Sequence, residues 1–551
     1  MPLDGPPETG NARLASVPAT GQAQPADPEP GTLEPPSSQS ATLEPPGPES
    51  ARRPRGRRAR TDAPASSAAS RPDLVTCLIA AAVFAAYTVI SVFRYLRHDP
   101  TSWDLGIFTE YVKQYAHLRA PIVDVRGAGF NLMGDHFHPI VAVIAPFFRL
   151  FPTPVTLLVA QALLAAVSVF PVSRAARELL GPGQGRAIAA AYGFSWGLQQ
   201  MVNYDFHEIA FAVPLLAFSL SALVRGRIRP AVLWALPLVF VKEDQGFTLA
   251  AIGLIMAFAY RKRGPGLFLA GWGLLWSFLA ILVILPHFNA SHTYGYWFAG
   301  GGVSTTGGHL SLASVWANLV SGASTKLPTL AEILLPTAFI ALRSPLILAA
   351  VPALLLRFVG TNPFYWDTQW HYNATVMPIV FLAAVDGLAR IKASRTAAAE
   401  APPSGEAAHP QLPGTGRRNP LAIGAERYGA ALMLGACAAL AFQFPLSSLW
   451  TPSTYQLGPH VAAQNAAMAL VPDGATVATD LDLLAPLAAR TDTFWLGNGS
   501  NPPTRYVVFD NQNGDWSPQS DALAFVESQT HNTRYQQIYS VDGVFVFRRI
   551  G

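Results

Sequence analysis

Apolar runs separated by short polar turns fill most of the chain between Leu74 and Pro445. The candidate membrane spans are 74–93, 155–173, 187–202, 209–224, 230–241, 246–260, 266–285, 331–342, 345–359, 372–389 and 428–446. A spanning helix needs about 20 mostly apolar residues. The runs 230–241 and 331–342 are therefore expected to be tilted, re-entrant or longer than these bounds. Another run, 139–151, is bounded by prolines and is expected to be interfacial or half-inserted. The pattern predicts an α-helical polytopic membrane protein with about 11 spans and an interfacial helix.

Both ends of the chain lack this pattern. Residues 1–72 are rich in Pro, Glu, Ser and Ala, and we expect a disordered tail before the membrane domain 73–450. Residues 451–551 alternate helical and strand-like stretches, which predicts a small α/β domain. Its expected helices are 458–470, 481–489 and 519–529, and its expected strands are 475–479, 505–510 and 544–548. It has no glycine-rich nucleotide motif, P-loop or serine elbow, so we expect it to bind or pack and not to catalyse.

Composition supports a membrane protein and adds an orientation. Only 13% of the residues are charged, against about 25% in a typical soluble domain. If the arginine cluster at 52–60 is cytoplasmic, the basic turns 174–186, 225–229 and 261–263 and the flexible loop 391–427 are cytoplasmic too. The short turns 203–208 and 360–371 on the other side contain no Lys or Arg. We therefore predict a bacterial plasma-membrane protein with a cytoplasmic N-terminus and an extracytoplasmic C-terminal domain.

Ionisable residues recur on the predicted outer side, where they are costly and usually functional. Five segments carry them: the first outer loop 94–138 with Asp104, Glu110 and the run Gly134–Pro139, the turn 203–208, the group 242–244, the loop with His287 and His292, and the turn 365–372. Their convergence from separate segments predicts one polar cavity at the outer leaflet.

Each of these features also has a structural interpretation. Asp104 is a good N-cap for a helix beginning at Leu105. Lys242, Glu243 and Asp244 are explained equally well as a neutralised cluster at a helix break. The aromatic residues of 365–372 suit either an interfacial belt or the floor of a sugar site. The glycine-rich stretch 300–308 is expected to be a lid or an ordinary loop.

A bound divalent metal ion is a further open alternative. Histidine and carboxylate side chains are ligands for zinc or manganese. The candidate ligands are Asp135, His136, His138 and His207. The two cysteines, Cys77 and Cys437, lie in apolar runs and predict neither a disulfide framework nor a cysteine metal site.

Five motifs give the chain a family resemblance. They are Asp104-Leu-Gly-Ile-Phe, Gly134-Asp-His-Phe-His-Pro, Phe206-His-Glu, Lys242-Glu-Asp and the His371-Tyr pair before Pro378. Over residues 74–551 the sequence resembles a family of bacterial predicted membrane proteins with a domain of unknown function. That family is similar in architecture to the GT-C glycosyltransferases, which have many helices, a long first outer loop with an acidic residue, and a C-terminal outer domain.

The resemblance implies a glycosyltransferase that uses a polyprenyl-phosphate sugar as donor. It implies an acidic base in the first outer loop, which is Asp104 here, with Asp135 as the competitor. The paired Asp-Glu often found at that base is absent, because the nearest acid is Glu110. Lys242, Arg126 or a histidine-bound metal ion is expected to stabilise the departing phosphate.

We therefore predict catalytic and substrate-binding residues for a sugar transferase acting on an envelope acceptor. The catalytic candidates are Asp104 and Asp135. The substrate-binding candidates are Glu110, His136, His138, Asp205, His207, Glu208, Lys242, Glu243, Asp244, Trp370 and His371. The expected partners are membrane lipid and the lipid-linked sugar, and no nucleic acid. The alternatives are a transporter or flippase and a non-catalytic envelope protein; oligomeric state is left open.

Overall fold

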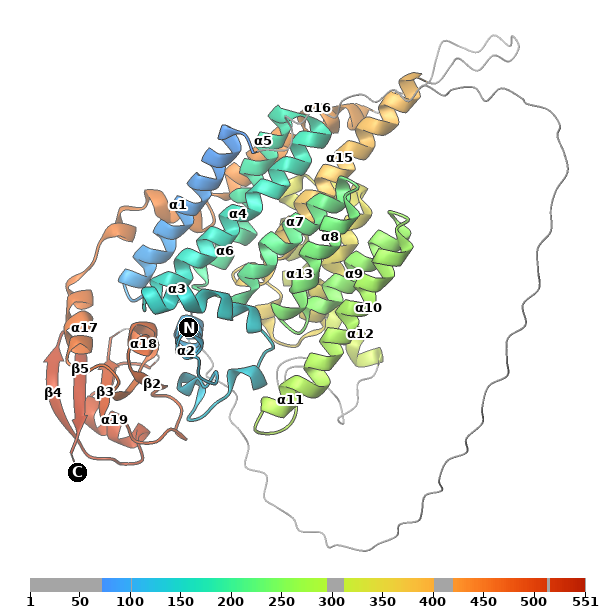
Figure 1. The fold of residues 1–551 in the computed structure, drawn as a ribbon. Helices are drawn as coiled ribbons and strands as arrows, with labels where there is room; N and C mark the ends of the chain where they lie inside the picture. The colour runs from blue at the N-terminus through green and yellow to red at the C-terminus, as the bar shows by residue number, and fades with distance from the viewer. Residues whose placement is uncertain (1–71, 101, 295–311, 401–419, 513–515, 551) are drawn as a thin grey trace, which may run out of the picture. The chain divides into compact units, whose positions relative to one another are not determined.

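A computed structural model describes residues 72–100, 102–294, 312–400, 420–512 and 516–550. Within them the protein is mostly helical, with one small sheet near the C-terminus (Figure 1). Three expectations lie wholly or partly outside the described residues: the disordered tail (all but residue 72), the glycine-rich stretch 300–308, and positions 401–419 of the loop 391–427.

In the described part of the chain, four helical stretches are long and apolar enough to cross a membrane. They are Leu74–Leu96, Val155–Leu180, Arg263–Phe288 and His371–Ala397. Shorter apolar helices are Pro139–Leu150, Glu208–Val224, Ile228–Phe240, Gln245–Phe258 and Pro345–Val359. These bounds match most of the predicted runs, and the number of spans remains a prediction.

The individual elements of the helical part follow the chain in this order. They are α1 (Leu74–Leu96), α2 (Asp104–Ala116), η2 (Asp124–Arg126), η3 (Leu132–Gly134), η4 (Pro139–Ile144), α3 (Ala145–Leu150), α4 (Val155–Leu180), α5 (Pro182–Gly193), α6 (Trp196–Asn203), η5 (Glu208–Phe211), α7 (Ala212–Val224), α8 (Ile228–Ala235), η6 (Leu236–Phe240), α9 (Gln245–Phe258), α10 (Arg263–Leu279), η7 (Ala280–Ile284), α11 (Leu285–Phe288), α12 (Leu312–Val320), α13 (Ala323–Leu334), η9 (Leu335–Thr337), η10 (Ile340–Arg343), η11 (Pro345–Ala350), α14 (Val351–Val359), η12 (Pro363–Tyr365), η13 (His371–Asn373), α15 (Val376–Glu400) and α16 (Pro420–Leu440).

The predicted span 187–202 is not one continuous helix, and the run 331–342, which was expected to be tilted, re-entrant or longer, is interrupted as well. The run 187–202 is divided between α5 and α6, because Ser195 has extended backbone and Gln199 donates its side-chain amide to the Phe194 carbonyl at 2.7 Å. The run 331–342 leaves the helix after α13, because Ala338 and Phe339 adopt left-handed backbone with φ of 47° and 60°. Left-handed residues cannot continue a right-handed helix.

Helix α15 lies at the centre of the helical part. It packs against α4 and α7, and its side chains from Val376 to Val385 are almost all buried in one apolar core. The helices α9 and α10 form a hairpin beside this core. Their backbones touch at glycines, since a Cβ on Gly246 would lie 2.2 Å from the Gly273 carbonyl oxygen. Such close glycine contacts are common between membrane helices.

The basic turns gather at one end of the helices. Glu178 accepts from Arg174 at 2.9 Å and pairs with Arg225 at 3.2 Å, which joins the ends of α4 and α7. Asp73 pairs with Arg186 at 2.8 Å, which adds the starts of α1 and α5. Figure 1 shows α5 and α16 at the end opposite to α2 and the sheet. The separation predicted for basic turns and acidic loops is thus present, while the membrane side of each remains a prediction.

The C-terminal residues form a five-stranded sheet with helices on both faces. Its elements are η14 (Pro445–Trp450), η15 (Pro452–Tyr455), α17 (Pro459–Ala469), β1 (Thr476–Thr479), α18 (Leu481–Ala488), β2 (Asp492–Trp495), β3 (Tyr506–Asp510), α19 (Ala522–Gln529), β4 (Tyr535–Val541) and β5 (Val544–Arg549). The strand order is β2-β1-β3-β5-β4, with β2, β1 and β3 parallel and the others antiparallel. Neighbouring side chains of β3 enter different cores: Val508 packs with α17 and α18, and Val507 packs with α19. Strands β2 and β4 add to the three expected strands.

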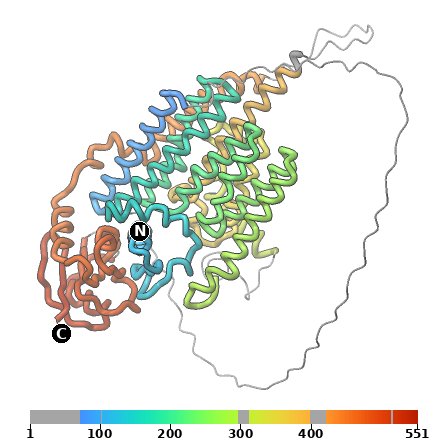
Figure 2. The backbone as a smooth tube through the Cα atoms, in the orientation of Figure 1, coloured from blue at the N-terminus to red at the C-terminus, as the bar shows by residue number. Residues whose placement is uncertain are grey.

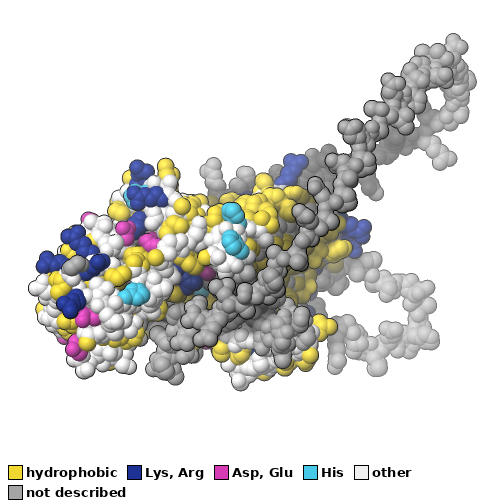
Figure 3. Space-filling model, turned by 90° about the horizontal axis from the view of Figure 1, so that it is seen from below, with side chains coloured by type: hydrophobic (Ala, Val, Ile, Leu, Met, Phe, Trp, Pro, Cys, Tyr) yellow, Lys and Arg dark blue, Asp and Glu magenta, His cyan; other side chains and the backbone are white. Residues whose placement is uncertain are grey.

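The C-terminal sheet domain rests on the first loop through α18 (Figure 2). Leu484 of α18 packs over Gly106 of α2. Lys113 of α2 donates to the carbonyls of Ala488 and Thr491 at 2.8 and 2.7 Å, which caps the end of α18. Figure 3 shows charged side chains gathered toward this end, while hydrophobic side chains cover much of the visible helical part. The contact fixes the helix that begins at Asp104.

A bulky residue at position 106 is expected to loosen this contact. A Cβ on Gly106 would lie 2.9 Å from Leu484, so Gly106→Val overpacks the interface at a cost of about 1–3 kcal/mol. We expect faster limited proteolysis of the C-terminal domain in the purified variant. Gly435→Val is the matched control, since a Cβ there meets open space. Adding Leu484→Ala restores room and is expected to recover part of the protection; no recovery would contradict this packing.

Candidate functional site

One cavity of about 570 Å³ lies among the first loop, the turn 203–208, the start of α9 and the loop before α15. Ten predicted site residues line it: Asp104, Asp135, His136, His138, His207, Glu208, Lys242, Glu243, Asp244 and His371. The structure thus brings together the polar groups of separate segments around one space. Their chemical roles remain predictions.

Asp104 is the first residue of α2, and its carboxylate is not the cap of that helix. The N-cap residue is Trp103, and its side chain makes no capping hydrogen bond to the helix. The Ser102 hydroxyl instead accepts from the Asp104 backbone N–H at 3.1 Å. Burial, together with the nearby charge of Asp104, raises the pKa of the Tyr204 hydroxyl, so Tyr204 stays neutral next to the carboxylate. The side chain of Asp104 lines the cavity beside the Tyr204 hydroxyl, with which it shares a hydrogen bond.

Glu243 holds the Gly134–Pro139 motif in place. Its carboxylate accepts from Nδ1 of His136 at 2.8 Å, from the Phe137 N–H at 3.0 Å and from the Tyr294 hydroxyl at 3.0 Å. Burial acts to raise the pKa of Glu243, but the charge and hydrogen bond of His136 lower it to about 2. Burial and Lys242 act to lower the pKa of His136, but Glu243 outweighs them and the pKa is raised. Each of the two side chains therefore favours the charged form of the other.

His138 in the same motif has a different environment. Its Nδ1 lies 3.1 Å from the Tyr111 hydroxyl, and its ring packs against Phe108. Burial lowers the pKa of His138 to about 4, so this imidazole is neutral. The His138 ring therefore lines the cavity as an uncharged polar group.

Glu208 joins a lysine and a histidine on the opposite wall. Its carboxylate is 1% exposed, with Oε1 at 3.2 Å from Nζ of Lys242 and Oε2 at 2.8 Å from Nδ1 of His207. The His207 ring stacks on the His371 ring, with centroids 3.7 Å apart and planes inclined by 21°. Segments far apart in the sequence thus meet at one buried carboxylate.

Removing one partner of this ion pair is expected to destabilise the protein. Lys242→Met leaves the Glu208 carboxylate buried without its ammonium partner, which costs roughly 3–5 kcal/mol. We expect a lower midpoint of thermal unfolding in detergent. Lys262→Met, in the exposed turn between α9 and α10, is the control and should leave the midpoint unchanged. The double variant Lys242→Met/Glu208→Gln removes both charges and should recover stability; an equal loss in the double variant would contradict the pairing.

The competitor base Asp135 is paired with a cation. Its carboxylate lies 3.5 Å from the Arg126 guanidinium. Arg126 also lies over the Trp103 ring at 4.8 Å, and its carbonyl accepts from the Asn498 side chain of the C-terminal domain at 3.4 Å. Trp495 of β2 meets Trp103 edge to face at 5.5 Å. The C-terminal domain therefore contacts the cavity rim, although we expect no catalysis from it.

Arg357 in α14 is a cavity residue that was not among the sequence candidates. Its guanidinium donates to the Tyr365 carbonyl at 2.8 Å, to Oδ1 of Asn373 at 2.8 Å and to the Asp367 carbonyl at 3.2 Å. No carboxylate within the described residues forms an ion pair with it. The signal was present, since Arg357 is the only charge in the apolar run 345–359, and charges inside such runs usually mark function.

A metal ion does not fit the described side chains. Among the residues described, no group of three or more His, Cys, Asp or Glu side chains is arranged to hold one. Of the proposed ligands, His136 is bound to Glu243 and Asp135 is paired with Arg126. We therefore assign no step to a metal ion.

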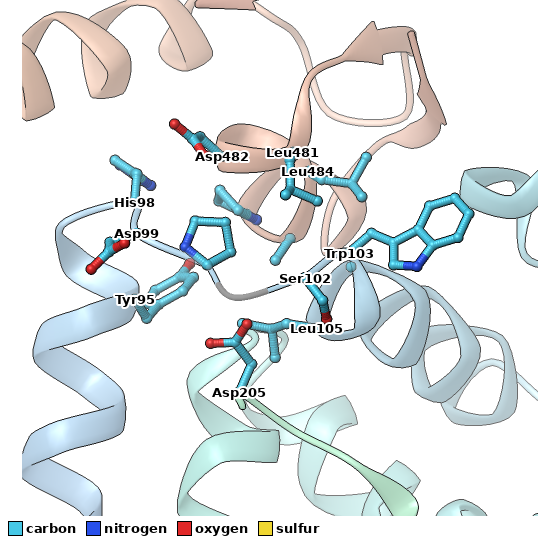
Figure 4. Close-up of a pocket in the computed structure, with 14 residues that line it drawn as sticks. Tyr95, His98, Asp99, Ser102, Trp103, Leu105, Asp205, Leu481, Asp482 and Leu484 are labelled. Carbon is cyan, nitrogen blue, oxygen red and sulfur yellow. The ribbon is translucent and has the colours of Figure 1, made fainter. Parts of the chain in front are cut away.

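Three predicted substrate-binding residues do not line the cavity. Glu110 is fully buried and accepts from the Val125 N–H at 3.1 Å. Asp205 lies beside a separate space of about 20 Å³ between the segment before α2 and α18 (Figure 4). Trp370 packs edge to face on Tyr204 at 5.3 Å. The sequence places these residues near the site, but their side chains are used for packing the loops around it.

Glu110 is expected to tolerate the loss of its charge. Burial raises its pKa to about 8 even though Lys113 acts to lower it, so the carboxyl group is mostly protonated at pH 7. Glu110→Gln keeps the size and the acceptor for Val125, and we expect unchanged membrane abundance and thermal midpoint at pH 7. Glu110→Ala removes the acceptor and should lower the midpoint by an amount typical of a lost buried hydrogen bond, about 1–3 kcal/mol. A large loss with Gln would show that the charge itself is needed.

Comparison with known proteins gives a family and two similar folds. The family model described as "Predicted membrane protein (DUF2079)" matches residues 95–546. No curated protein matches the sequence. Crystal structures of ArnT from Cupriavidus metallidurans are similar to this chain. The undecaprenyl phosphate-bound form has 12% identity and a TM-score of 0.48, covering 86% of this chain and 98% of that one. The apo form has 13% identity and a TM-score of 0.47, covering 86% and 97%.

Proposed function

The chain belongs to the predicted membrane protein family DUF2079, and we propose that it is a membrane glycosyltransferase. In this proposal it moves a sugar from a polyprenyl-phosphate donor to an envelope acceptor. The reaction takes place in the cavity of about 570 Å³ at the outer leaflet of a bacterial plasma membrane. The C-terminal domain lies on the same side.

The observation that carries the proposal is the balance of charges in the cavity. Three carboxylates have cationic partners: Asp135 with Arg126, Glu208 with Lys242, and Glu243 with His136. Asp244 accepts from its neighbour Gln245, and burial raises its pKa. Among the described residues that line the cavity, Asp104 and Asp244 are the carboxylates without an ion pair, and Arg357 is the guanidinium without one. A buried charge is costly when it is unpaired, so the buried Arg357 is expected to be used by a substrate.

Asp104 and Arg357 suit the two halves of a sugar transfer. Asp104 can take the proton from an acceptor hydroxyl as that oxygen attacks the anomeric carbon. Arg357 can stabilise the phosphate that departs, since a guanidinium binds phosphate through several hydrogen bonds. The structure therefore favours Arg357 over Lys242 and Arg126, which already have acidic partners.

The walls of the cavity fit a lipid-linked sugar. Helices α12 and α14 give it an apolar side, formed by Val315, Ala353, Leu355, Leu356 and Val359. Aromatic rings of Trp103, Tyr204, Tyr365 and Tyr372 line the polar side. An apolar wall suits the polyprenyl chain, and aromatic faces stack on the apolar side of sugar rings. The combination supports a donor with a lipid tail and a sugar head.

The direct test is to profile envelope glycans and glycolipids of a deletion strain, with the wild-type gene restored as control. We expect one glycan or glycolipid to lose a sugar and its lipid-linked donor to accumulate. Purified protein in nanodiscs should then release polyprenyl phosphate from a panel of short-chain polyprenyl-phosphate sugars. An unchanged glycan profile, or accumulation of an intact substrate on one side of the membrane, would contradict the enzyme and favour the transporter alternative.

A further inference from the structure

His207 is held in a defined orientation in the cavity wall. Its Nδ1 faces Oε2 of Glu208 at 2.8 Å. Its ring is stacked on His371 at 3.7 Å and meets the edge of Phe108 at 5.6 Å. The His207 backbone N–H donates to the Gln161 side chain at 3.1 Å, which fixes the turn that carries it. Main chain and ring plane are thus both constrained.

A carboxylate oxygen at 2.8 Å from Nδ1 favours the tautomer of His207 that has its proton on that nitrogen. Nδ1 of His207 interacts with Glu208. The His207 ring lines the cavity, so Nε2 is the ring nitrogen that can interact with a substrate there. A histidine held this way by a carboxylate can give or take a proton at its second nitrogen, and the carboxylate stabilises the charged ring.

Neutralising Lys242 does not by itself explain this arrangement. One oxygen of Glu208 is sufficient for the ammonium group, at 3.2 Å. The second oxygen is used for a histidine that also lines the cavity. The same carboxylate therefore positions an imidazole and a lysine beside the end of the cavity that contains Arg357, whose charge acts on the neighbouring His371.

We propose that His207, positioned by Glu208, is a second proton-transfer residue that protonates the departing phosphate. This inference rests on the proposed function. The acceptor oxygen forms its bond to the anomeric carbon and loses its proton to Asp104. The bond from the anomeric carbon to the phosphate oxygen breaks, and its electron pair stays on the phosphate. That oxygen takes the proton from Nε2 of the charged His207, which becomes neutral. Water returns a proton to His207 and removes one from Asp104 before the next turnover.

The groups around the ring determine how pH is expected to act. Glu208 and Tyr204 belong to the same turn as His207, and the His371 ring stacks on it from η13. The charges of His138 and Lys242 affect Glu208, and Asp104 lies beside Tyr204. A proton donor must be charged at the start of the reaction. The rate is therefore expected to fall as pH rises and the donor becomes neutral.

The experiment measures release of polyprenyl phosphate against pH, with full-length protein in nanodiscs and the panel of short-chain polyprenyl-phosphate sugars. We expect His207→Gln to lower kcat by roughly 10²-fold and to remove the alkaline fall. Glu208→Gln should lower kcat and move the fall to lower pH, because the carboxylate that stabilises the charged ring is gone. His287→Gln is the control, since His287 is exposed and does not line the cavity, and it should keep the alkaline fall at its wild-type pH.

The outcomes separate the inference from the function on which it rests. If His207→Gln keeps the alkaline fall and loses only thermal stability or membrane abundance, the residue is structural and the inference is overturned. A Glu208→Gln profile that does not move overturns the positioning role. If wild-type protein releases polyprenyl phosphate from no donor and the deletion strain keeps its glycans, the proposed function itself fails.

Discussion

Asp104→Asn is expected to reduce sugar transfer by roughly 10³-fold at neutral pH, with normal membrane abundance. The change keeps the size of the side chain and removes the only group in the proposal that accepts the acceptor proton. Asn lacks the charge, and its amide is a very weak base. Because Asp104 is not the cap of α2, the loss of its carboxylate should leave the helix intact. Sugar transfer and thermal unfolding are measured on the same preparation.

Asp135→Asn is the matched control for this result. Asp135 has the same side chain, lines the same cavity and lies in the same loop, but it is paired with Arg126. We expect a loss of about tenfold or less, caused by a shift of Arg126 against Trp103. If Asp135→Asn abolishes transfer and Asp104→Asn retains it, Asp135 is the base and the role assigned to Asp104 is wrong. If both retain it, the base lies elsewhere in the cavity.

Sequence patterns predicted the helical part well where apolar runs were long. The runs beginning at 74, 155 and 372 became helices that include almost every expected residue. Runs with glycine, serine or proline near the middle were less informative, because an apolar run shows burial and not whether the helix continues. Backbone conformation at Ser195 and at Ala338 decided those cases. Neither can be seen in an apolar count.

In the C-terminal domain the expected strands were found and two others were missed. Strand β4 is mostly exposed, so it lacks the apolar alternation that marks a half-buried strand. The turn that follows it was a usable signal: Asp542-Gly543 has φ of 49° and 75° at its two residues, as two-residue hairpin turns require. Strand β2 has four residues and pairs only with β1, which leaves little pattern to detect.

The sequence predicted most of the residues that line the site, but it did not predict which of them form ion pairs with one another. Asp104, His207, Glu208 and His371 were expected together, because charged residues recurred at one end of the apolar runs. Sequence could not show which carboxylate takes which cation, since that depends on distances of a few ångströms between separate loops. For the same reason it could not separate Glu110, which points away into packing, from its neighbours on the same helix.

Arg357→Gln is expected to abolish the binding of lipid phosphate. A guanidinium makes charge-assisted hydrogen bonds to phosphate worth about 1.5–3 kcal/mol each, so losing two of them weakens binding by roughly 10²–10⁴-fold. Three donors of Arg357 are already used to bind Tyr365, Asn373 and Asp367, which hold the group rigid beside the cavity. Arg357→Lys keeps the charge but not this fixed fork, and we expect it to recover only part of the affinity.

The measurement is the rise in thermal midpoint that short-chain polyprenyl phosphate gives to the full-length protein. Saturating ligand at 100 times its dissociation constant stabilises a protein by about 2.7 kcal/mol, and this gain should disappear in Arg357→Gln. Arg343→Gln is the matched control, because Arg343 is exposed on η10 and does not line the cavity. It should keep the full gain. A lower midpoint without ligand but an unchanged gain with it would mean that Arg357 only holds the loop 365–373, and the anion would then have to bind at Lys242 or Arg126.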